Sequence, residues 1–328
     1  MVKILKKIMV TGGAGFVGFV ISKILSEDCN NEVHIIDNLS KEGKDEFFKE
    51  LIERPNVTFY KLDLTDIDIY KKLENDYDQI YHLAAIVGVE KVMKLPLQTL
   101  ENNTLSTIYL LDFVKKMKRK PKLLFTSSCE NYAGSVELGI AEVPTTENIP
   151  LCINDIFNPR WTYACSKILG ELAFFHYGNE FNSKVRIVRY HNIYGPRMGN
   201  NHVIPEFILR ILNKEDPFLM YGGNQYRTFC YVYDAAKMTI QVMERSQDIL
   251  YNIGSDETET LIKDIAMYLF DIANFYPKII EKDPPKGSIL RRKPDMSKLK
   301  KESLFVYETS FKDGLKKTYN WYEKYSNI

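Results

Sequence analysis

The sequence predicts an α/β protein with a doubly wound parallel sheet and a smaller C-terminal lobe. Short apolar runs alternate with helical stretches of about ten residues or more through the first part of the chain, which is the pattern of parallel βαβ units. A glycine-rich segment, Gly12 to Gly18, joins the first apolar run to the first helical stretch. The 328 residues are 45% apolar and 27% charged, an ordinary globular composition, and suffice for about two domains.

The apolar runs and the helical spacing place the elements in order along the chain. Strands are expected at residues 7–11, 32–37, 57–62, 79–83, 122–126 and 185–190. Helices are expected between them, at residues 16–25, 44–53, 67–74, 97–118 and 160–181. Right-handed crossovers between parallel strands bring ligands to the carboxyl ends of the strands.

The alternation ends after Gly195 and Pro196, where glycine, proline, asparagine and tyrosine become frequent. We therefore expect a first domain over residues 1–192, to which residues 228–253 return. The remaining residues, 193–227 and 254–328, are expected to form the smaller lobe that binds the substrate.

Charge and cysteine content exclude several classes of protein. The chain has 44 Lys and Arg against 43 Asp and Glu, so no net field attracts it to nucleic acid or to an anionic membrane. No run approaches the ~18 apolar residues of a membrane span. Five scattered cysteines without a CxxC pair argue against a disulfide framework and against a zinc or other metal site. They favour a reducing, cytoplasmic location.

The glycine-rich segment has the spacing of a dinucleotide-binding turn. Gly12 permits the tight turn, Gly15 lets the backbone approach a diphosphate, and Gly18 allows close packing of the helix on the strand. Phe16 and Val17 begin that helix, whose free N–H groups face the phosphates.

An acidic residue at the end of the second strand selects the cofactor. Asp37 follows Gly18 by 19 residues and is placed to bind a ribose 2′-hydroxyl, with Asn38 beside it. A carboxylate repels a 2′-phosphate, so the sequence predicts a Rossmann domain that binds NAD rather than NADP.

Tyr163 and Lys167 form a YxxxK pair in the helical stretch that starts near Arg160. The i, i+4 spacing puts the phenol and the ammonium on one face of the helix. A free phenol has a pKa of ~10, which is too high for a base at neutral pH. A neighbouring ammonium, together with an oxidised nicotinamide, favours the phenolate. We therefore expect Tyr163 to act as a base and Lys167 to lower its pKa.

The glycine motif followed by YxxxK resembles an extended short-chain dehydrogenase/reductase of the nucleotide-sugar epimerase, dehydratase and decarboxylase group, and the resemblance runs nearly end to end. It implies that Asp63 and Leu64 contact the adenine and that Leu83, Ala84 and Ala85 pass under the cofactor. Asn103 resembles the buried helix asparagine of the family, which we also assign to the cofactor site.

The same resemblance assigns the residues near the sugar. Ser128 falls where the family has its catalytic Ser or Thr, which binds the sugar hydroxyl. Glu130, two places later, resembles the dehydratases and decarboxylases, since simple 4-epimerases usually lack it. Cys129 replaces the first acid of the acidic pair found in dehydratases acting on dTDP-glucose, which weakens that alternative.

Later segments resemble the substrate-binding parts of the family. Tyr190 and His191 correspond to positions near the nicotinamide, and Asn192 to a contact with the substrate diphosphate. The other expected substrate contacts, for the sugar, the base and the phosphates, are Glu90, Lys91, Val203, Arg227, Arg291 and Arg292.

From this resemblance we expect oxidation of a GDP- or UDP-linked sugar at C4. The closest local match is a GDP-heptose 4-dehydrogenase of capsule biosynthesis. The alternatives are a UDP-glucuronate decarboxylase, a GDP-type 4,6-dehydratase and a 4-epimerase. A non-catalytic NAD-binding regulator is a remote alternative.

The resemblance also implies assembly through the helices at residues 97–118 and 160–181. Apolar residues in excess of one core-facing stripe, among them Leu111, Phe113, Phe174, Leu172 and Phe175, favour a homodimer or a dimer of dimers.

Overall fold

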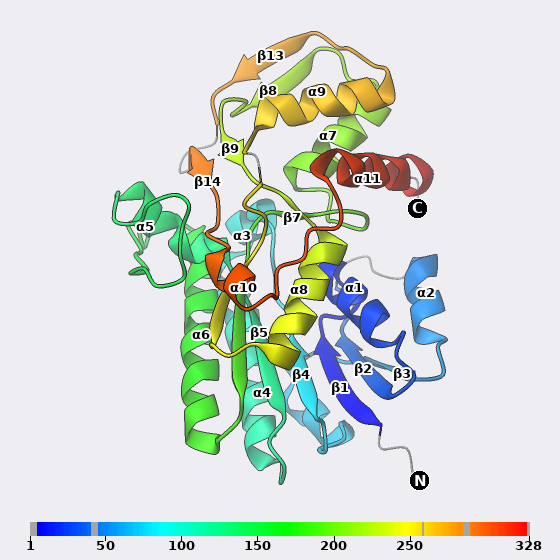
Figure 1. The fold of residues 1–328 in the computed structure, drawn as a ribbon, viewed down its shortest axis with the longest axis vertical. Helices are drawn as coiled ribbons and strands as arrows, with labels where there is room; N and C mark the ends of the chain where they lie inside the picture. The colour runs from blue at the N-terminus through cyan, green and yellow to red at the C-terminus, as the bar shows by residue number, and fades with distance from the viewer. Residues whose placement is uncertain (1–4, 41–44, 258, 285–288, 327–328) are drawn as a thin grey trace. The chain divides into compact units, whose positions relative to one another are not determined.

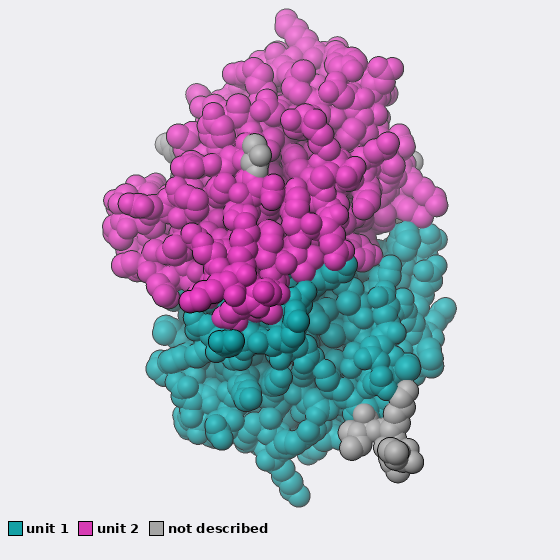
Figure 2. Space-filling model, in the orientation of Figure 1, with its two compact units in different colours: residues 1–131, 155–189, 236–251 teal, residues 132–154, 190–235, 252–328 magenta. Residues whose placement is uncertain are grey.

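A computed structural model describes residues 5–40, 45–257, 259–284 and 289–326. The chain divides into two compact units (Figure 2). Unit 1 comprises residues 1–131, 155–189 and 236–251, and unit 2 comprises residues 132–154, 190–235 and 252–328. Residues 132–154 thus belong to unit 2, although the expected boundary of the first domain lay at residue 192.

Unit 1 is built on a seven-stranded sheet in the order β11-β6-β5-β4-β1-β2-β3 (Figure 1). The pairings of β1 with β2 and β4, of β2 with β3 and of β4 with β5 are parallel, and flanking helices complete a Rossmann-like fold, so the predicted fold class is confirmed. The strands are β1 (Lys6–Thr11), β2 (Asn31–Asp37), β3 (Val57–Lys61), β4 (Gln79–His82), β5 (Lys122–Ser128), β6 (Val185–Tyr190) and β11 (Leu250–Ile253).

The expected helices of unit 1 are found in order, together with one short helix, α3, that was not expected. They are α1 (Phe16–Leu25), α2 (Glu46–Ile52), α3 (Val89–Lys94), α4 (Pro96–Lys116), α6 (Trp161–Phe181) and most of α8 (Val232–Arg245). The stretch expected at 67–74 is a 3₁₀ helix, η1 (Ile67–Lys72), and the first residue of the stretch expected at 44–53 lies outside the described residues. Asp66 and Asp45 cap η1 and α2 by accepting a backbone hydrogen bond.

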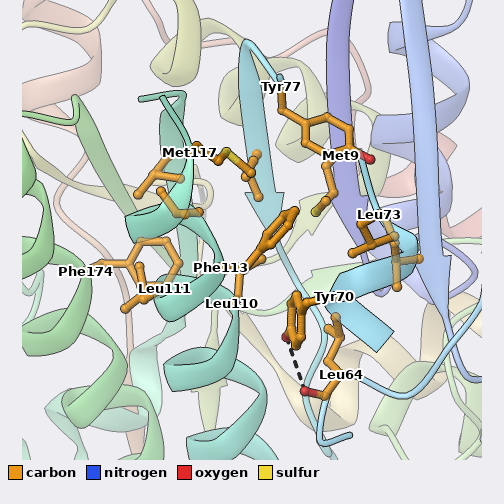
Figure 3. Close-up of a cluster of buried hydrophobic side chains, with 14 of the residues drawn as sticks. Met9, Leu64, Tyr70, Leu73, Tyr77, Leu110, Leu111, Phe113, Met117 and Phe174 are labelled. Atoms are coloured by element: carbon orange, nitrogen blue, oxygen red, sulfur yellow. Dashed lines mark hydrogen bonds between the residues drawn. The ribbon is translucent and has the colours of Figure 1, made fainter. Parts of the chain in front are cut away.

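Alternation along the strands directs side chains to both faces of the sheet. Met9 on β1 and Ile36 on β2 belong to the core under α4 and α6, shown in Figure 3. Ile35, next to Ile36 on β2, points to the other face of the sheet. There it lies close to Gly13, just before α1, since a Cβ added to Gly13 would be 2.7 Å from Cγ2 of Ile35. Helices therefore cover both faces, as a doubly wound sheet requires.

The core under α4 and α6 also corrects one expectation. Leu111, Phe113 and Phe174 are 0%, 8% and 0% exposed and pack in this core, so they are not part of an outward apolar surface. Leu172 and Phe175 do face outward, at 57% and 38% exposure. Full burial of one such side chain stabilises the folded state by about 1.5–3 kcal/mol. Leu111, Phe113 and Phe174 therefore stabilise the fold of the single chain.

Unit 2 has its own aromatic core, in which Phe218 packs edge-on against Phe207 and Phe270. Its helices are α5 (Ala133–Glu137), α7 (Val203–Leu212), α9 (Ile262–Ala273), α10 (Ser297–Lys301) and α11 (Phe311–Tyr325). Its short strands include the parallel pair β8 (Phe218–Tyr221) and β13 (Ile279–Lys282). No helix among the described residues has the length and hydropathy needed to cross a bilayer.

Candidate active site

The glycine-rich turn between β1 and α1 leaves no room for side chains at two positions. Gly12 has a φ of +69°, and a Cβ there would lie 2.8 Å from the backbone nitrogen of Ala84, at the end of β4. A Cβ on Gly18 would lie 2.2 Å from the carbonyl oxygen of Gly12. The turn, the helix and the neighbouring strand end are therefore packed backbone to backbone, and only glycine fits.

The turn forms a cradle that fits a dinucleotide diphosphate. Gly15 is the N-cap of α1 and has no side chain to cover the helix end. Phe16 and Val17 are the first two helical residues, and the N–H groups of a first turn have no partner within the helix. Backbone N–H groups at such an end bind anions.

Asp37 and Asn38 extend this cradle at the end of β2. The carboxylate of Asp37 accepts hydrogen bonds from the backbone nitrogens of Ala14 (3.1 Å) and Leu39 (2.8 Å), which fixes it beside the glycine-rich turn. Asn38 donates to Asp63 at 2.9 Å. Burial alone would raise the pKa of Asp63, but hydrogen bonds from Thr65 and Asn38 outweigh it and lower the pKa, so Asp63 stays ionised.

The end of β4 is held by Thr11, at the end of β1. The hydroxyl of Thr11 accepts hydrogen bonds from the backbone nitrogens of Leu83 (3.2 Å) and Ala84 (3.3 Å), and it contacts Nδ1 of His82 at 2.8 Å. Burial, with a contribution from Lys167, lowers the pKa of His82 to about 3, so this ring is neutral. Leu83, Ala84 and Ala85 are partly buried, and Leu64 is buried.

Asn103 connects three segments of unit 1. Its side chain pairs with the backbone of Ile86 in both directions, at 2.7 and 3.2 Å, and donates to the hydroxyl of Ser166 at 3.1 Å. Ser166 in turn donates to the backbone oxygen of Tyr163 at 2.7 Å. Asn103 therefore fixes the segment after β4 relative to the helix that carries Tyr163.

Tyr163, Lys167 and Ser128 are brought together by α6 and the end of β5. Lys167 donates to the backbone oxygen of Thr126 at 2.8 Å, and its ammonium lies 5.9 Å from the centre of the Tyr163 ring. Burial lowers the pKa of Lys167 to about 7, although the charge of Glu171 raises it. Burial raises the pKa of Tyr163; a hydrogen bond with Ser128 lowers it and the charge of Glu130 raises it further. The phenol is therefore protonated until more positive charge lies beside it.

Glu171 and Arg189 form a buried ion pair next to these residues, which was not anticipated from the sequence. Glu171, one further turn along α6, accepts hydrogen bonds from Ser127 (2.5 Å), Asn131 (2.8 Å) and both Nε and Nη2 of Arg189 (2.8 and 2.5 Å). Ser127 and Asn131 flank the segment that carries Ser128 and Glu130. One carboxylate thus anchors both ends of that segment.

Glu130 is paired with Arg160, which stands at the start of α6. Nη2 and Nε of Arg160 lie 2.6 and 3.2 Å from Oε2 of Glu130, and the two side chains are 21% and 24% exposed. The backbone nitrogen of Glu130 donates to the hydroxyl of Ser128 at 3.2 Å. The structure therefore places an arginine at the carboxylate that the sequence assigns to the sugar.

The remaining expected substrate and nicotinamide residues lie in different places. Glu90 forms an exposed ion pair with Lys94 on α3, next to Lys91. The others belong to unit 2. There His191 contacts Asn252 at 3.0 Å, and Asn192, with a φ of +43°, donates to the backbone oxygen of Thr228 at 2.9 Å. Tyr190 and Arg292 are partly buried, and Val203 begins α7.

Two of the expected phosphate-binding arginines have protein partners in unit 2. Arg227 donates to the backbone oxygens of Ile289 (2.7 Å) and Leu290 (3.2 Å). Arg291 forms a two-point ion pair with Glu259, at 2.6 Å for both bonds. Both side chains are therefore held in place by the protein itself.

Three residues of the site were missed from the sequence. The sequence spacing could have indicated Glu171, because it lies at i+8 from Tyr163 and at i+4 from Lys167. All three residues therefore share one face of α6. Arg160 and Arg189 had no such signal, because their partners lie 30 and 18 residues away and meet them only in the fold.

Residues 8–254 match the model of the NAD dependent epimerase/dehydratase family. The UDP-N-acetyl-α-D-glucosaminuronate decarboxylase of Bacillus cytotoxicus is 34% identical over 333 residues, covering 98% of this chain and 99% of that protein. The structure of UDP-N-acetylglucosamine 4-epimerase from Methanobrevibacter ruminantium, in complex with UDP-N-acetylmuramic acid, is 31% identical with a TM-score of 0.85, covering 99% of each chain. That of UDP-glucuronic acid 4-epimerase from Bacillus cereus, with UDP-glucuronic acid and NAD, is 26% identical with a TM-score of 0.86, covering 97% of this chain and 99% of that one.

These comparisons correct the expected reaction. The prediction of a GDP-heptose 4-dehydrogenase is wrong, because the similar proteins are UDP-sugar decarboxylases and 4-epimerases. Of the alternatives kept open from the sequence, the UDP-glucuronate decarboxylase and the 4-epimerase fit better. The resemblance to the extended short-chain dehydrogenase/reductases and the choice of NAD as cofactor are confirmed.

We expect Asp37→Asn to narrow the preference for NAD over NADP by about tenfold, or ~1.4 kcal/mol. Asparagine keeps an oxygen that can accept the Ala14 hydrogen bond but removes the charge that repels a 2′-phosphate. Titration calorimetry with both cofactors measures the change, and Asp68→Asn, an exposed residue on η1, is the control. Equal affinities of the unaltered protein for NAD and NADP would contradict the assignment.

The buried Lys167 predicts a pH dependence of stability. Its pKa is about 7 in the folded protein and 10.5 as an ordinary lysine, so between these values the unfolded chain holds the additional proton. The free energy of unfolding should therefore rise with pH from about 7 to 8.5, by at most about 1.4 kcal/mol per pH unit. Lys167→Met should flatten this rise in urea titrations, whereas Lys49→Met, at an exposed site on α2, should not. An identical slope in Lys167→Met would refute the assignment.

Proposed function

Because the chain belongs to the NAD-dependent epimerase/dehydratase family, we propose that it is an enzyme that decarboxylates a UDP-linked hexuronic acid. The observation that carries the proposal is Glu130, which follows Ser128 by two places and is held by Arg160 in the same unit as Tyr163. A glutamate at this place resembles the decarboxylases and dehydratases of the family rather than its simple 4-epimerases. The 34% identical relative from Bacillus cytotoxicus is named as such a decarboxylase.

The residues present can perform the steps that a hexuronic acid needs. Bound NAD supplies a hydride acceptor, and later a donor, for the sugar C4. Ser128 orients the C4 hydroxyl, and Tyr163 takes its proton as the hydroxyl becomes a ketone. Burial raises the pKa of Tyr163, so this step depends on positive charge at the phenol, part of which Lys167 provides.

Oxidation at C4 converts the hexuronic acid into a β-keto acid, whose C5–C6 bond can break to release CO2. The electron pair of that bond moves to C5 and onto the C4 oxygen as an enolate. Ser128 and the protonated Tyr163 stabilise this oxygen by hydrogen bonds, and a proton then adds at C5. No base is needed to remove a proton from C5, because CO2 leaves from it instead. A hydride returned to C4, together with a proton passed from Tyr163 to the C4 oxygen, would then give a UDP-pentose.

A 4-epimerase is the second candidate, since epimerase structures match with TM-scores as high as 0.85 and 0.86. It would use the same Tyr163, Lys167 and Ser128 but leave the C6 group in place. The product of the reaction decides between the two.

We expect incubation with NAD and UDP-glucuronate, or its 2-acetamido analogue, to give a product lighter by one CO2, measured by mass spectrometry. UDP-glucose and UDP-N-acetylglucosamine should be unchanged in mass. Tyr163→Phe should lower the rate by about 10²–10⁴-fold, the usual cost of losing a general base or acid. Tyr177→Phe, the same change on α6 at a tyrosine that donates to Asp112, is the control. An unchanged mass with inversion at C4, seen by NMR, would favour the epimerase instead.

We further propose that the protein is a homodimer formed through α4 and α6, which pack against each other. Leu105 on α4 and Leu169, Leu172 and Phe175 on α6 are 37–57% exposed, and such clustered apolar surface is usual at interfaces. Light scattering of the purified protein should give a dimer or tetramer mass, and Leu172→Glu with Phe175→Glu should give a monomer. A monomer mass for the unaltered protein at micromolar concentration would contradict this assembly.

A further inference from the structure

The Glu130–Arg160 ion pair lies at the reacting end of the site. Glu130 follows Ser128 by two residues and donates its backbone N–H to the Ser128 hydroxyl. Arg160 precedes Tyr163 by three residues, which is one turn of α6. Ser128 hydrogen bonds with Tyr163, and the charge of Glu130 acts on the Tyr163 phenol. The pair therefore borders the two hydroxyls that would hold the sugar C4 oxygen.

With the C4 oxygen held by Ser128 and Tyr163 as proposed above, the substituent at sugar C5 would lie near this ion pair. C5 is bonded to C4, so a carboxylate at C6 is only two bonds from the carbon on which Tyr163 acts. In UDP-glucose the same position carries a neutral hydroxymethyl group. In that pose the two sugars would differ in charge near Glu130.

Glu130 without its arginine would repel a hexuronate. Two carboxylates within a few ångströms raise the free energy of the bound state, and partial burial weakens the screening by water. A guanidinium is always charged at neutral pH and suits a site with two carboxylates, because its planar fork has five N–H donors. The Arg160 side chain is 21% exposed, so a bound ligand can reach its guanidinium. The rest of the side chain is buried, so water screens its charge only in part.

We propose that Arg160 is a specificity-determining residue, which admits a sugar with a C6 carboxylate by cancelling the charge of Glu130. This inference rests on the proposed function for its choice of substrate. It predicts that substitutions at Arg160 and Glu130 change the relative affinity for charged and neutral sugars in opposite directions.

The test uses binding, so that it does not depend on turnover. Titration calorimetry with the NAD-loaded Tyr163→Phe protein gives the dissociation constants of UDP-glucuronate and UDP-glucose and hence their ratio. In that background, Arg160→Met should shift the ratio at least tenfold towards UDP-glucose. Arg160→Lys should keep most of the preference, and Arg160→Met with Glu130→Gln should restore it, because the net charge is then unchanged.

Glu130→Gln alone is the variant that keeps the test decisive if Arg160→Met fails to fold. It removes one negative charge, so it should shift the ratio towards UDP-glucuronate. Arg119→Met breaks an exposed ion pair with Asp78 in the same unit and should leave the ratio unchanged.

The outcomes separate this inference from the proposed function. Ratios that stay within twofold in both Arg160→Met and Glu130→Gln would overturn the role of Arg160, even if CO2 is released by the active protein. Shifted ratios in a protein that releases no CO2 would support the role of Arg160 and reject the decarboxylase. Failure to bind either nucleotide sugar would overturn both.

Discussion

One buried carboxylate organises the part of unit 1 that carries Ser128 and Tyr163. Glu171 on α6 accepts hydrogen bonds from Ser127 and Asn131 and forms an ion pair with Arg189 of β6. A second contact from the same helix face, Lys167 to the backbone oxygen of Thr126, fixes the strand just before this segment. Removing one partner of a buried ion pair typically costs about 3–5 kcal/mol, because the other charge is left without compensation. The segment from residue 127 to residue 131 is therefore held firmly at both ends, and the groups it carries keep their positions.

The charged side chains around Tyr163 form two groups, an inner and an outer layer, and each contains both positive and negative charge. The inner layer is Glu171 with Arg189 and Lys167, in which burial lowers the pKa of the lysine and the carboxylate opposes that change. The outer layer is Glu130 with Arg160, close to Ser128. Burial raises the pKa of the Tyr163 phenol, so the protein by itself stabilises the acid form. A phenol that stays protonated in the protein alone and gives up its proton more readily when positive charge is added suits a reaction in which one proton is removed and another is returned.

Much of the fold was predictable because the signals are local. The strands and helices of the sheet follow from hydrophobic periodicity, and their order implies parallel pairing with helices on both faces. The glycine positions follow from backbone sterics: Gly12 has a positive φ, and Gly18 contacts the backbone of the turn. Other features had no local signal. The outward direction of Leu111, Phe113 and Phe174 was predicted wrongly, because the choice of which apolar residues of a long helix face inward depends on what packs against it.

The sequence by itself determined the fold class, the cofactor turn and the pairing of Tyr163 with Lys167 on one helix face, because each depends on residues within a few positions of one another. Only the tertiary structure decided which group pairs with Glu130. A carboxylate two residues after Ser128 is compatible with several reactions, and its chemistry depends on the group that neutralises it. That group is Arg160, 30 residues further along, and it reaches Glu130 because the packing of α6 against β5 brings the start of the helix to the end of the strand. Electrostatic interactions depend on distance in space, which the spacing of residues along a chain does not supply.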